Sequence, residues 1–409
     1  MKKILLFSLF TTWVFGQDQI GSDIDGEAAD DESGISVSID SDGSHVAIGA
    51  KGNDGGGSNA GHVRVYEWDG SSWDQVGADI NGEANYNYSG WSVSIDSDGS
   101  HVAIGAPYNT GSPGGNSGHV RVYEWDGSSW DQVGGDIDGE VAGDRSGWSV
   151  SIDSDGSHVA IGAPYNDGGG SNAGHVRVYE WDGSSWDQVG SDIDGEAADD
   201  ESGISVSIDS DGSHVAIGAR YNDGNGSSSG HVRIYEYSGG SWIQVGGDID
   251  GEAAGIRSGI SVSIDSDGSH VAIGAHYNNG HAGHVRVYEW NGSAWGQVGS
   301  DIDGEAAYDY SGESVSIDSD GSHVAIGAKG NDGGGSNAGH VRVYEWDGSS
   351  WDQVGSDIDG EAANDESSTS VSIDSDGSHV AIGGNWNDGS FSNAGHVRVY
   401  GSGAIISGS

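Results

Sequence analysis

A short pattern of alternating polar and apolar residues recurs along the chain. In its first complete copy, residues 36–39 (SVSI) and 45–48 (HVAI) flank the dipeptide Asp42-Gly43. Alternation with a period of two is typical of β-strands that bury one face. Asp-Gly between two such runs favours a tight type I′ turn, because both of its central residues need positive φ. We therefore predict a β-hairpin here.

Two further strands follow in the same copy. Residues 62–68 (HVRVYEW) are rich in β-branched and aromatic residues, which favour strands. The turn at residues 69–72 (DGSS) then leads into residues 73–77 (WDQVG). The acidic segment at residues 79–83 (DINGE) connects to the next copy. Each copy therefore predicts four antiparallel strands in the order up, down, up, down.

The whole unit is copied in series. The stretch IDSDGSHVAIGA at residues 39–50 returns at intervals of 56, 57, 56, 56, 53 and 56 residues. A fixed period of this length indicates one supersecondary unit that stacks on its neighbours, and four-stranded units of this kind form β-propellers. We predict an all-β, seven-bladed β-propeller. The first aspartates of the seven copies are Asp40, Asp96, Asp153, Asp209, Asp265, Asp318 and Asp374.

The two ends of the repeat array are complementary. Residues 18–21 resemble the fourth strand of a unit, whereas the last unit stops after its third strand at residues 396–400. We predict that the N-terminal strand completes the last blade, which removes two open sheet edges. The propeller is thus predicted over residues 17–400, with a C-terminal tail at 401–409.

The first sixteen residues are typical of a signal peptide. Lys2 and Lys3 precede an apolar run at residues 4–15, and the small residue Gly16 follows it. The run is too short to span a bilayer, and we predict no other membrane segment. We therefore expect residues 1–16 to be removed and the protein to be secreted or held at the cell surface.

Composition narrows the classes of partner. The chain of 409 residues has 65 acidic and 14 basic side chains, a formal net charge of -51. Nucleic acid is excluded as a partner, because phosphate binding needs a basic surface. There is no cysteine, so disulfides and thiolate metal sites are excluded too.

Short motifs that follow the second strand point to a known family. Gly-Ala-Pro stands at residues 105–107 and 162–164, and Ser-Gly precedes the first strand in six units, as at Ser33-Gly34. In this order the motifs resemble the FG-GAP repeats of integrin α-subunit propellers and their bacterial relatives. Those repeats have Phe-Gly before the first strand, where this chain has Ser-Gly. The resemblance implies an extracellular binding propeller with calcium loops between the first two strands. In other units Lys51, Arg220, His276 or Lys329 replaces the proline.

The resemblance is weakest at the calcium loop. The loop here is shorter than in the family, and His45 stands about where the last acidic residue would be. Calcium needs six to eight oxygen ligands, of which Asp40 and Asp42 supply few. Two interpretations remain open: a plain Asp-Gly hairpin, or a weak calcium site at Asp40 and Asp42.

A second acidic motif, Asp-Ile-Asp-Gly-Glu, also recurs along the chain, with Asn81 in place of the middle aspartate in one copy. Its first copy places Asp23, Asp25 and Glu27 on alternate residues, so the three carboxylates would share one side of an extended segment. They could hold a cation, with calcium the candidate, or they could pair with the arginine of the third strand, such as Arg64. A buried arginine needs such a partner. No cofactor is required by the sequence.

Variation between units is confined to two classes of loop. The second-to-third-strand loops and the segments entering each first strand vary, and in such blades both classes lie at one end of the strands. Adjacent units 2 and 3 are rich in aromatic residues there, which predicts a patch that binds protein or glycan. The alternative is that two of the tryptophans only fill the channel. The residues are Tyr86, Tyr88, Trp91, Tyr108, Trp148 and Tyr165.

The units are nearly identical, so no nucleophile and base are unique to one blade. We therefore predict no catalytic residue and no enzyme. The favoured function is a non-catalytic, secreted or cell-surface binding or adhesion propeller. The alternative is a carbohydrate-binding, lectin-like propeller, and a hydrolase or lyase is the least favoured.

Overall fold

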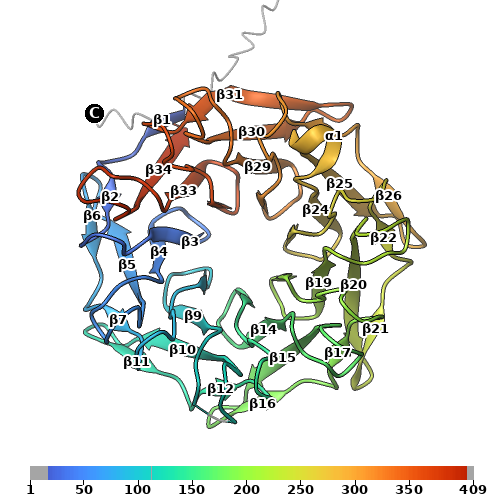
Figure 1. The fold of residues 1–409 in the computed structure, drawn as a ribbon, viewed down its shortest axis with the longest axis horizontal. Coiled ribbons are helices and arrows are strands. Elements are labelled where there is room, and N and C mark those ends of the chain that lie inside the picture. Colours follow the sequence, from blue (N-terminus) through green and yellow to red (C-terminus); the bar gives the residue numbers. More distant parts are fainter. Residues whose placement is uncertain (1–16, 112, 403–409) are drawn as a thin grey trace, which may run out of the picture.

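Seven β-sheets form a ring of blades around a central channel (Figure 1). The computed structural model describes residues 17–111 and 113–402; the predicted signal peptide, residues 1–16, and residues 403–409 of the predicted tail lie outside the described residues. One helical turn, α1 (Asn278–His281), occupies a shortened loop. The all-β, seven-bladed propeller predicted from the repeats is confirmed.

Each blade consists of four antiparallel strands, numbered from the channel outward. Blade 1 contains β3 (Ser33–Ile39), β4 (His45–Ala50), β5 (His62–Trp68) and β6 (Trp73–Gln75). Blade 2 contains β8 (Ser92–Ile95), β9 (His101–Ala106), β10 (His119–Trp125) and β11 (Trp130–Gln132). Blade 3 contains β13 (Ser149–Ile152), β14 (His158–Ala163), β15 (His175–Trp181) and β16 (Trp186–Gln188).

The remaining blades repeat this order. Blade 4 contains β18 (Ser205–Ile208), β19 (His214–Ala219), β20 (His231–Ser238) and β21 (Ser241–Gln244). Blade 5 contains β23 (Ser261–Ile264), β24 (His270–Gly274), β25 (His284–Trp290) and β26 (Trp295–Gln297). Blade 6 contains β28 (Ser314–Ile317), β29 (His323–Ala328), β30 (His340–Trp346) and β31 (Trp351–Asp359). Blade 7 contains β32 (Ser370–Ile373), β33 (His379–Gly384), β34 (His396–Ser402) and β1 (Gln17–Gln19).

The acidic motif adds a short fifth strand, which the sequence did not predict. Ile80 faces Val63 across β5, and Ile80 is only 5% exposed, so burial of its side chain fixes this segment on the third strand. The motif is therefore held rigidly at the outer part of every blade. The short strands are β2 (Ile24–Asp25), β7 (Ile80–Asn81), β12 (Ile137–Asp138), β17 (Ile193–Asp194), β22 (Ile249–Asp250) and β27 (Ile302–Asp303), and in blade 6 the motif continues β31.

The hydrophobic core lies between neighbouring blades. Val46 and Ile48 of blade 1 pack in one cluster with Val397 and Val399 of blade 7, and every other pair of neighbours forms an equivalent cluster. Second and third strands are buried on both faces for this reason, whereas the first strand alternates between buried and half-buried residues. Stability of each blade therefore depends on its two neighbours.

The ring closes as predicted from the two ends. β1 pairs antiparallel with β34, with Asp18 opposite Gly401, and Ile24 of β2 lies opposite Val397. β34 runs to Ser402, so it includes two residues that the sequence placed in the tail. A closed circle of backbone hydrogen bonds also lines the channel. It runs from the N–H of one serine to the carbonyl of the next through Ser41, Ser97, Ser154, Ser210, Ser266, Ser319 and Ser375, and back to Ser41.

The first hairpin differs from the predicted type I′ turn. Gly43 has φ of 73°, but Asp42 does not have positive φ, and the Gly43 N–H donates to the Asp40 carbonyl at 3.4 Å. The loop therefore spans residues 40–44. It is longer because the Asp40 carboxylate organises it, as described below.

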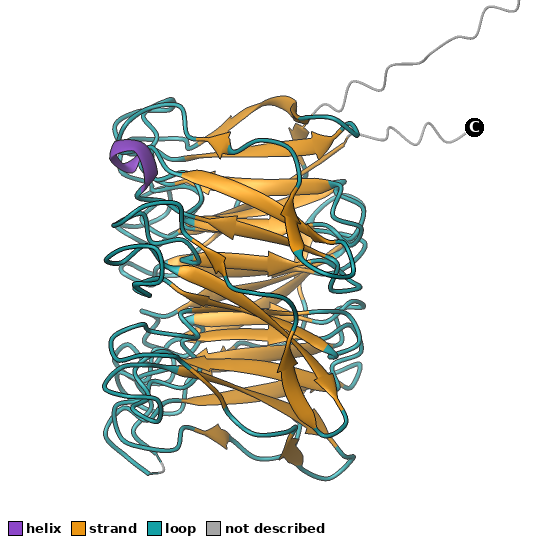
Figure 2. Ribbon diagram, turned by 90° about the vertical axis from the view of Figure 1, so that its right-hand side faces the viewer, coloured by secondary structure: helices purple, strands orange, loops and turns teal. Residues whose placement is uncertain are grey.

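The two ends of the strands form unlike faces (Figure 2). One face, which we name the turn face, carries the short DSDG and DGSS turns. The other, the variable-loop face, carries α1, the second-to-third-strand loops and the segments that enter each first strand. Within the described ranges, none of the helical structure is long and apolar enough to cross a membrane.

Candidate functional site

Five of the six predicted aromatic residues pack together on the variable-loop face. Their ring centroids lie 4.7–5.6 Å apart in a chain that crosses from blade 2 to blade 3. Tyr86 is 55% exposed, and within the described part of the chain no ring contact joins it to the others. We name the five the aromatic cluster: Tyr88, Trp91, Tyr108, Trp148 and Tyr165.

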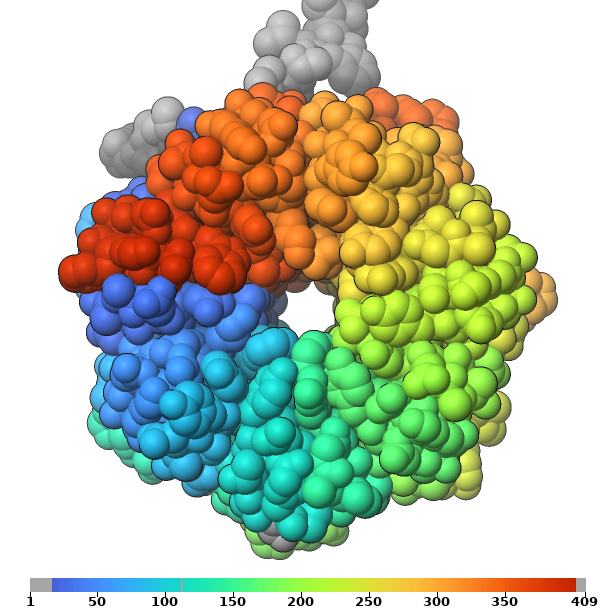
Figure 3. Space-filling view, in the orientation of Figure 1, coloured from blue at the N-terminus to red at the C-terminus, as the bar shows by residue number. Residues whose placement is uncertain are grey.

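The cluster borders the mouth of the channel. Trp91 and Trp148 directly precede β8 and β13, and they line the channel mouth together with the equivalent residues of the other blades. Figure 3 shows this opening at the centre of the ring. The two tryptophans therefore both line the channel, as the alternative reading held, and belong to the aromatic cluster.

Two cations lie against these rings. The guanidinium of Arg145 is 4.7 Å from the centroid of Tyr108 and 4.5 Å from that of Tyr165. Lys51 lies 4.7 Å from the Trp91 ring centroid and pairs with Glu32 at 2.9 Å. Cation–π contacts of this kind hold a positive charge in place without neutralising it.

A charged cavity of about 340 Å³ lies on the same face, beside blades 4 to 6. Lys329 pairs with Glu313 at 2.8 Å, and Arg257 lies 4.1 Å from the Tyr277 ring centroid. Burial tends to raise the pKa of Glu313, but His276 and Lys329 outweigh it and lower that pKa. Burial lowers the pKa of His276 to about 4, so its imidazole is neutral at neutral pH. The other lining residues are Arg220, Ile260, Tyr310 and Glu366.

The basic residues outside the repeat pattern are distributed unequally between the two faces of the ring. Of the 14 lysines and arginines, two belong to residues 1–16 and seven are the repeated arginines of the third strands. The other five all stand on the variable-loop face, either directly after a second strand or in a segment that enters a first strand. They are Lys51, Arg145, Arg220, Arg257 and Lys329.

Sequence reasoning did not identify the charged cavity, although a signal was present. Lys51, Arg220, His276 and Lys329 share one repeat position, directly after the alanine that follows the HVAIG run of the second strand. A second shared position has positive φ of 47° to 58° in all seven blades. It is occupied by Glu32, Tyr88, Arg145, Glu201, Arg257, Tyr310 and Glu366. At this second position the backbone φ is constant while the side chain changes from blade to blade, which distinguishes it from the rest of the repeat.

Asp40 and Asp42, the candidate calcium ligands, hold the first hairpin. The Asp40 carboxylate accepts hydrogen bonds from the Ser44 hydroxyl at 3.1 Å and from the His45 backbone N–H at 2.9 Å, and it lies 2.8 Å from His45 Nδ1. Asp42 accepts the Ser44 N–H at 3.0 Å. These contacts occupy the oxygens within the loop, which favours the hairpin interpretation over a calcium site.

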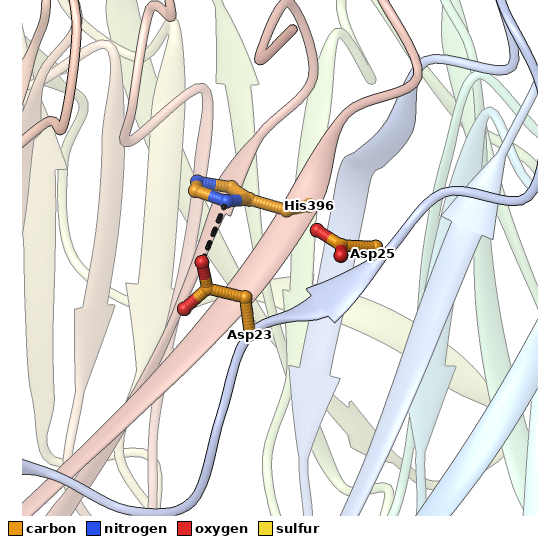
Figure 4. Close-up of side chains that lie close together, drawn as sticks. All are labelled: Asp23, Asp25 and His396. Carbon is orange, nitrogen blue, oxygen red and sulfur yellow. Dashed lines mark ion pairs between the residues drawn. The ribbon is translucent and has the colours of Figure 1, made fainter. Parts of the chain in front are cut away.

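The second acidic motif faces both an arginine and a histidine. Glu27 lies 4.0 Å from Arg64, which donates hydrogen bonds to the Tyr66 hydroxyl at 2.6 Å and to the backbone carbonyl of Asp25 at 2.8 Å. Asp23 lies 3.7 Å from Nδ1 of His396, with Asp25 close by (Figure 4). The motif thus contacts the predicted arginine through its glutamate, and its first aspartate meets a histidine that sequence reasoning did not connect with it.

Comparison with known proteins agrees with the resemblance seen in the sequence. The family model of the FG-GAP repeat matches residues 137–179 and 191–235. The chain therefore contains FG-GAP repeats, and the other units share their sequence pattern and blade structure. No curated protein matches the chain.

Solved propellers of several kinds share the fold. A Bacteroides uniformis protein that is named as a putative 6-phosphogluconolactonase has a TM-score of 0.54 at 11% identity, covering 80% of this chain and 85% of its own. The periplasmic gluconolactonase of Pseudomonas aeruginosa has a TM-score of 0.54 at 14% identity, with the same coverage. The hydrazine synthase of Kuenenia stuttgartiensis has a TM-score of 0.55 at 14% identity, covering 89% and 94%. At these identities the likeness shows the fold alone.

These structures contradict the prediction that the chain is not an enzyme. Proteins named as lactonases share the same ring of repeated blades, so repetition does not exclude catalysis. The physical reason is that a repeated scaffold can carry different side chains in each loop. The charged cavity is such a departure, because Arg257, His276 and Glu313 occur together only between blades 4 and 6 in the described chain.

Proposed function

We propose that the protein is a secreted or cell-surface binding propeller that attaches to its ligand through the variable-loop face. The observation that supports this most is the gathering of all five non-repeated basic residues of residues 17–402 on that face. Lys51, Arg220 and Lys329 pair with glutamates, whereas no ion pair holds Arg145 or Arg257 in the described chain. In a chain of net charge -51, these two unpaired cations mark where an anion can approach. The resemblance to extracellular repeats and the predicted signal peptide support the location.

Exposed apolar side chains support the same face. Large apolar residues that remain exposed mark interaction surfaces when they gather in one region. Five of the seven large apolar side chains exposed in the described structure lie in loops of the variable-loop face, and the other two lie in blade 4. The five are Tyr86, Val141, Tyr308, Trp386 and Phe391.

The chemistry of the aromatic cluster fits an acidic saccharide. Tryptophan and tyrosine rings offer flat apolar surfaces, which pack on the apolar face of a sugar ring. Arg145 stands among these rings, and within the described chain its guanidinium has no carboxylate partner within ion-pair distance. It can therefore bind the carboxylate or sulfate of a sugar that lies on the rings. In this proposal the aromatic rings and Arg145 supply all the contacts to the sugar.

A glycan array with neutral and uronic-acid oligosaccharides tests the proposal. We expect selective binding to acidic glycans, and about a hundredfold loss of affinity in the double variant Trp91→Ala, Tyr108→Ala, because both rings are central to the surface. Arg145→Gln should reduce the preference for acidic over neutral glycans by about tenfold.

Trp125→Ala provides the matched control. Trp125 lies in the same blade, but it pairs with Trp130 across the turn on the opposite face. It should leave glycan affinity unchanged. Equal losses in the control and in the double variant would refute a site at the aromatic cluster, and so would an array without any acidic-glycan binding.

A further inference from the structure

A buried histidine meets two carboxylates at each junction between blades. His62 of β5 is 1% exposed, and its Nδ1 lies 3.9 Å from both Glu27 and Asp79. Asp79 precedes β7 in the same blade, whereas Glu27 follows β2, which belongs to blade 7. The three side chains therefore come from two neighbouring sheets.

The arrangement recurs around the ring. His119 Nδ1 lies 4.0 Å from Glu83 and 3.5 Å from Asp136, and His396 lies 3.7 Å from both Asp23 and Glu361. Equivalent groups are formed around His175 and His231, and two more groups of metal-ligand type are present. Repetition of one geometry in separate blades indicates that it follows from the repeat and not from a local accident.

In five of the seven groups the imidazole nitrogen that faces the carboxylates lacks a hydrogen bond, whereas Nδ1 of His284 lies 2.8 Å from Nδ2 of Asn278. Nδ1 is buried and without a hydrogen-bond partner in the described structure at His62, His119, His175, His231 and His340. A buried polar atom left in this state costs free energy, so each such nitrogen is a position where an ion or a water molecule would be stabilised.

Outer contacts aim one oxygen of each carboxylate at the imidazole. Gln75 donates to Oδ1 of Asp79 at 2.8 Å, which leaves Oδ2 facing His62. Glu27 likewise turns Oε1 toward Arg64 and Oε2 toward His62. Metal ligands are oriented by second contacts of this type. The glutamine contact recurs at Asp23, Asp136, Asp192, Asp248, Asp301 and Asp357.

The spacing suits an ion better than direct hydrogen bonds. Nitrogen and oxygen atoms that share a hydrogen bond lie about 2.7–3.2 Å apart. Ligands at about 2.0–2.2 Å from a tetrahedral Zn²⁺ ion lie roughly 3.3–3.6 Å from each other. The observed nitrogen–oxygen distances of 3.5–4.0 Å are too long for the first range and start within the second, and all ligand atoms of a group lie within 4.8 Å of one another. Imidazole nitrogen with two carboxylates suits zinc-type ions, whereas calcium takes oxygen ligands.

We propose that the His–Asp–Glu groups between blades bind divalent metal ions of the zinc type, each ion linking one blade to the next. The carboxylates are partly exposed, 31% at Asp79 and 45% at Glu27, so an ion can enter from solvent. At His175 the group borders a cavity of about 570 Å³ lined by Glu140, Asp192 and Asp194. These positions are separate from Asp40 and Asp42 of the first hairpin. They border the variable-loop face, because Tyr165 of the aromatic cluster also lines this cavity.

Metal titration of the full chain tests this proposal. After treatment with chelator, we expect several equivalents of Zn²⁺ per chain, approaching seven, and a rise in melting temperature of at least about 5 °C. X-ray absorption at the zinc edge should show the outer-shell scattering of one imidazole per zinc. Zinc bound with oxygen ligands alone would overturn the proposal, because exposed acids bind cations without histidine.

Two sevenfold variants separate specific sites from general charge. The first replaces by Asn the aspartates Asp23, Asp79, Asp136, Asp192, Asp248, Asp301 and Asp357. The second makes the same change in charge on the turn face, at Asp42, Asp98, Asp155, Asp211, Asp267, Asp320 and Asp376. We expect the first to lose imidazole-bound zinc and the rise in melting temperature, and the second to keep both. Equal losses in the two variants would mean an adventitious ion only.

A variant with only three substitutions keeps the proposal testable if the sevenfold variants do not fold. The triple variant Asp79→Asn, Asp136→Asn, Asp192→Asn should lose about three of the seven equivalents and retain the rest. Unchanged stoichiometry in a folded triple variant would also overturn the proposal.

Discussion

A chain that lacks residues 1–25 is expected to melt about 6 °C or more below a chain that lacks only residues 1–16. The deletion removes β1 and β2 from blade 7, with the hydrogen bond from Ile20 N–H to Val399 and the burial of Ile24. Burial of one isoleucine contributes about 1.5–3 kcal/mol and each strand hydrogen bond about 1 kcal/mol. The loss is therefore roughly 5 kcal/mol or more, measured by thermal unfolding followed by circular dichroism.

A pair of point variants controls for effects of deletion as such. Ile24 and Ile80 occupy the same repeat position, and each is 5% exposed. Ile24 reaches blade 7 only if the N-terminus pairs with the last unit, whereas Ile80 follows the other strands of its own blade 1 directly in the sequence. Ile24→Ala and Ile80→Ala should each reduce the free energy of unfolding by about 2–5 kcal/mol. A harmless Ile24→Ala beside a costly Ile80→Ala would show that the N-terminal strand does not complete blade 7.

Stability should also fall as the pH rises above about 6.5. In all seven blades the buried aspartate of the first hairpin raises the pKa of the histidine that begins the second strand, His45 in blade 1. The folded state then holds protons that the unfolded state releases. Each such proton changes the free energy of unfolding by about 1.4 kcal/mol per pH unit.

The direction of this effect follows from the raised pKa. The stabilisation is fully present below the unfolded pKa of histidine and is lost as the pH rises through the folded pKa. Urea unfolding from pH 6 to pH 9 measures it. A variant with His45→Gln, His101→Gln and His158→Gln should show a shallower slope, since three of seven pairs with aspartate are gone. An identical slope in the variant would disprove the role of these pairs.

The fold could be predicted from the sequence because the same pattern of strands and turns recurs in every unit. The period of the IDSDGSHVAIGA stretch set the number of blades, and the two incomplete ends set the closure by β1. Ile80 shows what a local pattern misses. Ile80 is a single apolar residue between the polar residues Asp79 and Asn81, so the short strand β7 depends on a hydrophobic cluster that forms only when blades pack together.

The candidate sites were predictable only in part. Aromatic residues in adjacent units identified five members of the aromatic cluster, because neighbouring units become neighbouring blades. The charged cavity draws Arg220, His276 and Lys329 from three different units, and each substitution taken alone resembles neutral drift. The histidines between blades were equally hidden, since Glu27 and Asp79 are separated by a full repeat.

A crystal structure with a bound uronic-acid tetrasaccharide tests most directly whether the variable-loop face is the binding surface. We predict that a sugar ring lies on Trp91 and Tyr108 and that a carboxylate of the ligand pairs with Arg145. A saccharide bound on the turn face or at the outer rim of the blades, with the aromatic cluster uncovered, would contradict the proposed function.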